Sequence, residues 1–151
     1  MEINIPDVVA EVTTIFEEYE AALISNNVNI LDELFWHSPY TIRYGVNENL
    51  YGYEAIVAFR KARGKVNLDR VLMNTVITTY GRDFATVNTE FQCQETGKVG
   101  RQSQAWMRTS VVSIQLLAFS YQLLNIFKKL LRLAEDIFFI SFNYPWRLIL
   151  F

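Results

Sequence analysis

The sequence predicts an α+β fold in which helices come first and long antiparallel strands follow. Apolar residues recur at helical spacing in the first part of the chain, whereas Val, Thr, Ile and Phe are concentrated in three long stretches after Leu68. Runs of helices followed by runs of strands are typical of this class. With 151 residues, 51% of them hydrophobic, the chain has room for one globular domain with a core.

The first helix is predicted to begin at Asn4-Ile5-Pro6-Asp7, with Asn4 as its cap. An apolar stripe at helical spacing then places Tyr19 on the buried side of the helix, together with Val8, Val12, Ile15, Phe16, Ala22 and Leu23. The remaining faces carry glutamates, which is typical of a solvated surface: Glu11, Glu17, Glu18 and Glu20. The helix is expected to end at 25–27, where Asn27 or Asn29 begins a shorter helix.

A short strand is predicted at Tyr40–Tyr44, before a turn at Asn47–Asn49 and a third helix at Tyr53–Arg63. Side chains alternate along a strand, so Arg43 shares a face with Thr41. A guanidinium among aromatic and apolar neighbours needs an anion. A ligand carboxylate gripped in bidentate fashion would satisfy Arg43, and so would a structural Asp or Glu. A third alternative is an edge-strand arginine that lies over aromatic rings.

Three long strands are predicted at Val71–Tyr80, Phe84–Gln94 and Val99–Thr109. If both connecting turns have two residues, one face of the sheet carries Leu72, Asn74, Val76, Val87, Phe91, Gln102, Gln104 and Trp106. The other face then carries Met73, Thr75, Ile77, Asn88, Glu90, Arg101, Ser103 and Met107, and on this face Glu90 and Arg101 could pair with each other. Polar groups amid aromatic ones on the first face predict a partly polar cavity over the sheet.

Composition narrows the class of function. The net charge is −2 and the basic residues are scattered, so the sequence lacks the electrostatic pattern of a nucleic-acid binder. The single cysteine, Cys93, rules out an internal disulfide, and the single histidine, His37, leaves no His/Cys set with zinc spacing. We therefore expect neither a metal nor another cofactor. The N-terminus resembles neither a signal nor a transit peptide, which predicts a cytoplasmic protein.

Several motifs carry a family resemblance. They are Phe35-Trp36, Arg43-Tyr44-Gly45, 48–53 (ENLYGY), 78–85 (TTYGRDFA) and 100–106 (GRQSQAW). Together with the helix that contains Tyr19, they resemble the AtzH-like family of the nuclear transport factor 2-like (SnoaL-like) superfamily. That family includes the HpxZ-type proteins linked to oxalurate catabolism. The resemblance extends from about residue 3 to about residue 109.

The resemblance implies a cone-shaped fold in which helices close a strongly curved antiparallel sheet around a pocket, and a homodimer. It also implies a small ureide hydrolase of purine and ureide nitrogen catabolism, a deamidase that acts on dicarboxyurea-like or oxalurate-related anions. By position in the motifs, the catalytic residues are expected at Tyr19 and Arg43. Trp36, Gln104 and Trp106 are expected to bind substrate, and the alternative for Tyr19, Trp36 and Trp106 is a purely structural role in the core. The alternative is a non-catalytic binding or accessory protein, which could assist a partner amidohydrolase.

Beyond Thr109 the chain departs from the family, which normally closes with one more strand near a Gly-Trp-Arg motif. We therefore expect a domain at 1–109, with its last strand missing or replaced, and an atypical apolar tail at 110–151. The uncharged run Val111–Phe127 is short for a bilayer span, which takes about 20 residues, so a membrane segment is not favoured. Either Val111–Phe119 takes the place of the last strand, or an insertion has displaced that strand to Pro145–Leu148. An altered last strand could leave the protein inactive.

Overall fold

The computed structural model describes residues 1–64, 68–109 and 145–150. Within these residues the chain forms three helices and one six-stranded sheet, so the predicted α+β class is confirmed. The helices are α1 (Pro6–Ile24), α2 (Val28–Leu34) and α3 (Tyr53–Ala62). The strands are β1 (Ile42–Tyr44), β2 (Asn49–Tyr51), β3 (Arg70–Tyr80), β4 (Phe84–Cys93), β5 (Val99–Arg108) and β6 (Trp146–Leu150).

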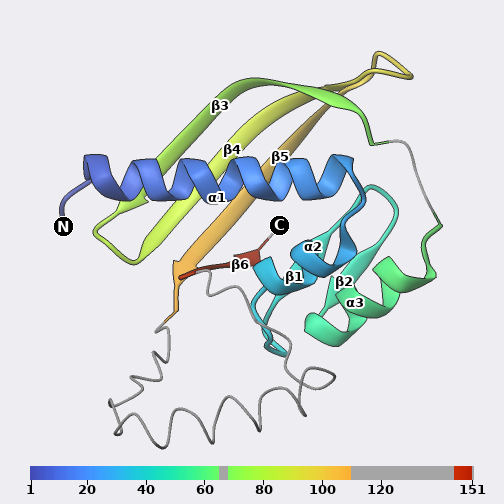
Figure 1. Cartoon of the computed structure of the whole chain (residues 1–151), viewed down its shortest axis with the longest axis horizontal. Helices are drawn as coiled ribbons and strands as arrows, with labels where there is room; N and C mark the ends of the chain where they lie inside the picture. The colour runs from blue at the N-terminus through green and yellow to red at the C-terminus, as the bar shows by residue number, and fades with distance from the viewer. Residues whose placement is uncertain (65–67, 110–144, 151) are drawn as a thin grey trace, which may run out of the picture. The chain divides into compact units, whose positions relative to one another are not determined.

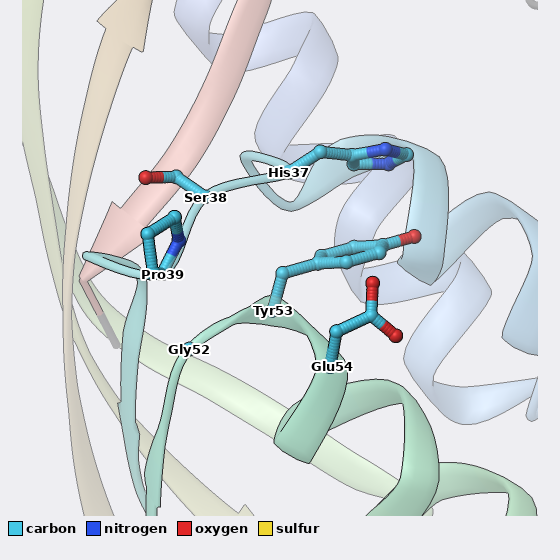
Figure 2. Close-up of a pocket in the computed structure, with 6 residues that line it drawn as sticks. All are labelled: His37, Ser38, Pro39, Gly52, Tyr53 and Glu54. Carbon is cyan, nitrogen blue, oxygen red and sulfur yellow. The ribbon is translucent and has the colours of Figure 1, made fainter.

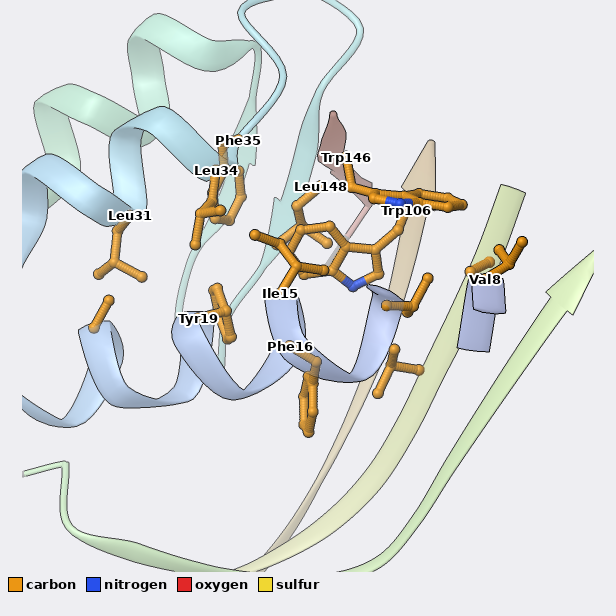
Figure 3. Close-up of a cluster of buried hydrophobic side chains, with 14 of the residues drawn as sticks. Val8, Ile15, Phe16, Tyr19, Leu31, Leu34, Phe35, Trp106, Trp146 and Leu148 are labelled. Carbon is orange, nitrogen blue, oxygen red and sulfur yellow. The ribbon is translucent and has the colours of Figure 1, made fainter. Parts of the chain in front are cut away.

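The strand order is β2-β1-β6-β5-β4-β3, and neighbouring strands are antiparallel except for the parallel pair β1 and β6. The long strands β3–β5 are curved, and α1 crosses them on one face of the sheet (Figure 1). The predicted apolar stripe of α1 forms most of the contact: Val8, Val12, Ile15, Phe16, Tyr19 and Ala22 are all buried. Figure 3 shows this stripe packed against side chains of α2, β5 and β6.

Two predicted features of α1 are wrong. Asn4 does not cap the helix; instead its side-chain Oδ1 accepts a hydrogen bond from the backbone N–H of Thr79, at 3.0 Å, and ties the N-terminus to β3. Glu20 is not solvated, because only 5% of it is exposed. By contrast, Asn27 caps α2 as predicted, since its Oδ1 accepts from the N–H of Ile30.

The register of β3 changes at a bulge between Met73 and Val76. Asn74 has a φ of 52°, and its side chain donates to Glu90 on the outer face. The extra residue reverses the alternation, so Ile77 faces the core and Val76 is exposed, contrary to the prediction for both. Thr75 likewise changes sides, because its hydroxyl contacts that of Thr89. The predicted pairing of Glu90 with Arg101 is confirmed.

The last strand of the sheet is formed by Trp146–Leu150, which pairs with β5 on one side and β1 on the other. Trp146 and Leu148 are fully buried, and the indole N–H of Trp146 donates to Glu11 at 3.1 Å. The place beside β5 is therefore held by the strand at Trp146–Leu150, as expected if an insertion displaced the last strand. The alternative at 111–119 lies outside the described residues. This strand belongs to the same compact unit as the N-terminal part of the chain.

Candidate functional site

A pocket of about 390 Å³ opens where α1, β1 and the ends of β3–β5 meet. It brings together Tyr19 and Arg43, the two residues that the sequence predicts to be catalytic. Its other described lining residues are Leu23, Tyr44, Gly45, Val46, Arg63, Leu68, Asp69, Arg70, Phe91, Cys93, Arg101 and Gln102. Four arginines against one aspartate make this lining suited to a small anion.

Tyr19 lies at the inner end of the pocket, with only 2% of its surface exposed. Its ring packs edge-on against Trp106 and tilts against Phe35, at centroid distances of 6.3 and 6.5 Å. Burial raises the pKa of the Tyr19 hydroxyl to about 12, and the adjacent Glu20 adds to this effect, while Arg70, Arg60 and Arg43 oppose it. The hydroxyl therefore stays protonated at neutral pH and can donate a hydrogen bond to a ligand.

Arg43 is held in the pocket wall, with 15% of its side chain exposed. Its Nη1 donates to the Glu48 carboxylate, and its Cζ lies 5.3 Å from the centroid of the Phe59 ring. The short turn between β1 and β2 places Glu48 there, since Gly45 N–H donates to the Glu48 carbonyl. Arg43 thus combines features of all three alternatives drawn from the sequence: it lines a pocket, it has an acidic partner, and it lies over an aromatic ring.

A buried polar cluster of Glu20, Arg70 and Gln102 lies beside the pocket, which Arg70 and Gln102 line. Arg70 donates from Nε and Nη2 to the Glu20 carboxylate at 2.7 to 3.0 Å, and from Nη2 to Gln102 Oε1 at 2.8 Å. Gln102 Nε2 closes the ring by donating to Glu20 Oε1 at 3.0 Å. Sequence reasoning missed this cluster, because helical spacing alone gives Glu20 a solvated face.

The predicted substrate-binding residues do not line this pocket. Trp106 and Gln104 are buried in the core, where the indole N–H of Trp106 donates to Gln104 Oε1 at 2.9 Å. The Nε2 of Gln104 has no hydrogen-bond partner among the described residues. Trp36 is half-buried, and its backbone N–H donates to the Leu148 carbonyl. Their roles in substrate binding stay predictions.

A second, smaller pocket of about 280 Å³ lies between the end of α2 and the start of α3. Figure 2 shows the His37 and Tyr53 rings stacked there, with Glu54 beside Tyr53. The ring centroids are 3.9 Å apart, and Ser38 also lines this pocket. His37 Nε2 also lies 3.3 Å from the carbonyl of Asp32 in α2, as expected for a histidine at a helix end. In the part of the chain that the structure describes, no group of acidic, His or Cys side chains could hold a metal ion.

The family model for AtzH-like proteins matches residues 1–120. This chain belongs to the AtzH-like family. Solved structures related in sequence have the same fold. One is a protein of unknown function from Pectobacterium atrosepticum, which is 41% identical to this chain and has a TM-score of 0.74. The match covers 98% of this chain and 90% of that one. A cystatin-like fold protein from Burkholderia xenovorans is 37% identical, with a TM-score of 0.73 and coverage of 99% and 92%.

The nuclear transport factor 2-like fold is shown as well. A nuclear transport factor 2-like superfamily protein from Salmonella enterica has a TM-score of 0.57 at 17% identity, with coverage of 95% of this chain and 87% of that one. No curated protein matches the sequence. Among the described residues, no helix has the length and apolar character to cross a membrane.

Proposed function

We propose that this AtzH-like protein is a small hydrolase that deamidates an anionic ureide such as dicarboxyurea. The observation that carries the proposal is that Tyr19 and Arg43 line one pocket whose other charged groups are mostly arginines. Arg43 binds a substrate carboxylate with its planar fork. Water attacks the ureide carbonyl carbon, the C–N bond breaks, and the leaving nitrogen takes up a proton. From dicarboxyurea the leaving group is carbamate, which then loses CO₂ and releases ammonia.

In this proposal Tyr19 acts as a hydrogen-bond donor. Negative charge develops on the ureide carbonyl oxygen as water adds, and a preorganised donor in a buried site stabilises that charge. The raised pKa of Tyr19 supports this role over that of a general base, which needs a pKa near the working pH. Burial of the ring against Phe35 and Trp106 fixes the direction of the hydroxyl.

The second candidate is a non-catalytic protein that binds a ureide or oxalurate-like anion. The raised pKa of Tyr19 also favours this candidate, because a hydroxyl with a pKa of about 12 is a poor general base. No histidine, which could act as a base instead, is found among the described lining residues. Under this alternative the pocket captures the anion for a partner amidohydrolase. The homodimer implied by the family resemblance and the predicted cytoplasmic location are part of both proposals.

Ammonia release from dicarboxyurea by the purified protein separates the two candidates. The enzyme releases ammonia, whereas the binding protein is stabilised against heat by the ligand without turnover. In the enzyme, Arg43→Ala should lower kcat/KM by about 30-fold or more, equivalent to about 2 kcal/mol for loss of a charged contact in a partly buried site. Tyr19→Phe should lower kcat with a smaller effect on KM, because the donor acts mainly in the transition state.

Two further variants test whether Arg43 acts through the ligand or only through Glu48. Glu48→Gln removes the carboxylate that pairs with Arg43, so turnover should persist if Arg43 binds substrate. Arg82→Ala is the matched control, because Arg82 is exposed, pairs with Asp7 and does not line the pocket. A folded Arg43→Ala protein with full ureide hydrolysis would refute the role of Arg43.

A further inference from the structure

We propose that Arg63 is a second anion-binding residue of this pocket, the one that recognises the second carboxylate of a doubly charged ligand. This inference rests on the proposed function for the identity of the site, because it concerns the pocket that contains Tyr19 and Arg43. It goes further by naming the residue that would recognise the second charge.

Arg63 and Arg43 reach the pocket from different elements and lie against the same ring. Arg43 comes from β1, and Arg63 is the residue that ends α3. Their guanidinium carbons lie 5.8 and 5.3 Å from the centroid of Phe59, which is itself on α3. Both side chains line the pocket, so a short molecule could contact both guanidinium groups at once.

The arginines of this pocket differ in their partners. Arg70 already donates from Nε and Nη2 to Glu20 and Gln102. Arg101 pairs with Glu90 on the outer face of the sheet, and 82% of its side chain is exposed. The charge of Arg70 is therefore neutralised within the pocket wall, and the charge of Arg101 is surrounded by water.

Arg63 is half-buried but has no carboxylate partner among the residues that the structure describes. Its Nη2 donates to the neutral Oδ1 of Asn26, at a long 3.5 Å. A guanidinium has five N–H donors, so most of those on Arg63 are left for a ligand. Asp69 also lines the pocket, where it is exposed to solvent.

The chemistry of the ligand follows from these two groups. A guanidinium matches a carboxylate in shape and charge, and two guanidinium groups at separate points of a pocket of about 390 Å³ favour a compact dianion over a monoanion. The pocket should therefore favour a ligand with two carboxylates, because a ligand with one carboxylate can pair with only one of these two guanidinium groups.

Malonate and acetate are suitable probes, because malonate has a carboxylate at each end and acetate has one. We would measure their binding by isothermal titration calorimetry and thermal shift to the wild-type protein, Arg63→Gln and Arg63→Ala. Arg63→Gln keeps a side chain that can still donate to Asn26, so we expect this variant to fold and a weaker affinity to reflect the lost charge. Arg82→Ala is the matched control, since it removes an exposed arginine that pairs with Asp7 and does not line the pocket.

Both Arg63 variants should bind malonate roughly tenfold more weakly, so that malonate loses most of its advantage over acetate, while Arg82→Ala stays within about twofold of the wild type. Malonate binding to folded Arg63→Gln at the wild-type affinity would overturn the inference, and so would a wild-type protein that binds malonate no better than acetate. The proposed hydrolase fails separately: a wild-type protein that binds malonate through Arg63 yet releases no ammonia from dicarboxyurea supports this inference and refutes the enzyme.

Discussion

Substitution of Glu20 by Gln should destabilise the protein more than any exposed charge change. The two oxygens of Glu20 accept from Arg70 Nε and Nη2 and from Gln102 Nε2. A glutamine has one acceptor oxygen, so at least one of these donors would then face an NH₂ group. The substitution also leaves the Arg70 guanidinium without its carboxylate.

The magnitude follows from burial. The side chains of Arg70 and Glu20 are 9% and 7% exposed, so little solvent screens the charge that remains. Removal of one partner from a buried pair typically costs 3 to 5 kcal/mol, and the oxygen that glutamine retains places Glu20→Gln at the lower end, about 3 kcal/mol. Replacement of both partners by apolar residues, Glu20→Leu with Arg70→Met, should recover most of the loss.

Urea unfolding followed by circular dichroism measures these free energies. Asp7→Asn is the matched control, because the Asp7–Arg82 pair is exposed on both sides and its loss should leave the free energy of unfolding unchanged within error. If Glu20→Gln also unfolds at the wild-type urea midpoint, the cluster does not stabilise the fold and the reasoning is wrong. A double variant less stable than Glu20→Gln would show that the polar cluster itself is favourable.

Two other predictions follow from buried aromatic side chains. Trp146→Ala should lower the free energy of unfolding by about 3 kcal/mol or more, because it removes a large side chain that is 1% exposed; a loss below 1 kcal/mol in urea would contradict the packing of β6. Since the folded pKa of Tyr19 is above its unfolded value of about 10, its contribution to stability is complete below pH 10 and is lost as pH rises through about 12. The wild type should therefore lose stability over this range faster than Tyr19→Phe, by up to about 1.4 kcal/mol per pH unit, and parallel stability curves would argue against the raised pKa.

The helices were predictable because their signals are local. The apolar stripe through Tyr19 recurs at a single period, and the cap at Asn27 is set by residues three positions apart. The third helix begins at Tyr53 as predicted and ends within one residue of the predicted position. The prediction that Asn4 caps the first helix failed for a tertiary reason. Its side chain instead accepts a hydrogen bond from Thr79 of β3, about 75 residues away in the chain.

Long-range pairing accounts for the other errors. The bulge at Asn74 has no signal in the period of apolar residues, yet it reverses the faces of Val76 and Ile77. Burial of Glu20 depends on Arg70 and Gln102, which only the folded sheet brings to α1. For the candidate site, family motifs indicated Tyr19 and Arg43 and the structure places both at one pocket, whereas the neighbouring arginines could not be grouped without the sheet.

The position of β6 has a consequence for the order in which the protein can be assembled during translation. In the sheet, β6 lies between β1 and β5, so the strand that carries Arg43 is joined to the long strands through Trp146–Leu150. The ribosome releases these residues after every other described strand. The nascent chain can therefore fold α1 onto β3–β5 early, but it cannot join the Arg43 hairpin to that sheet until β6 has emerged.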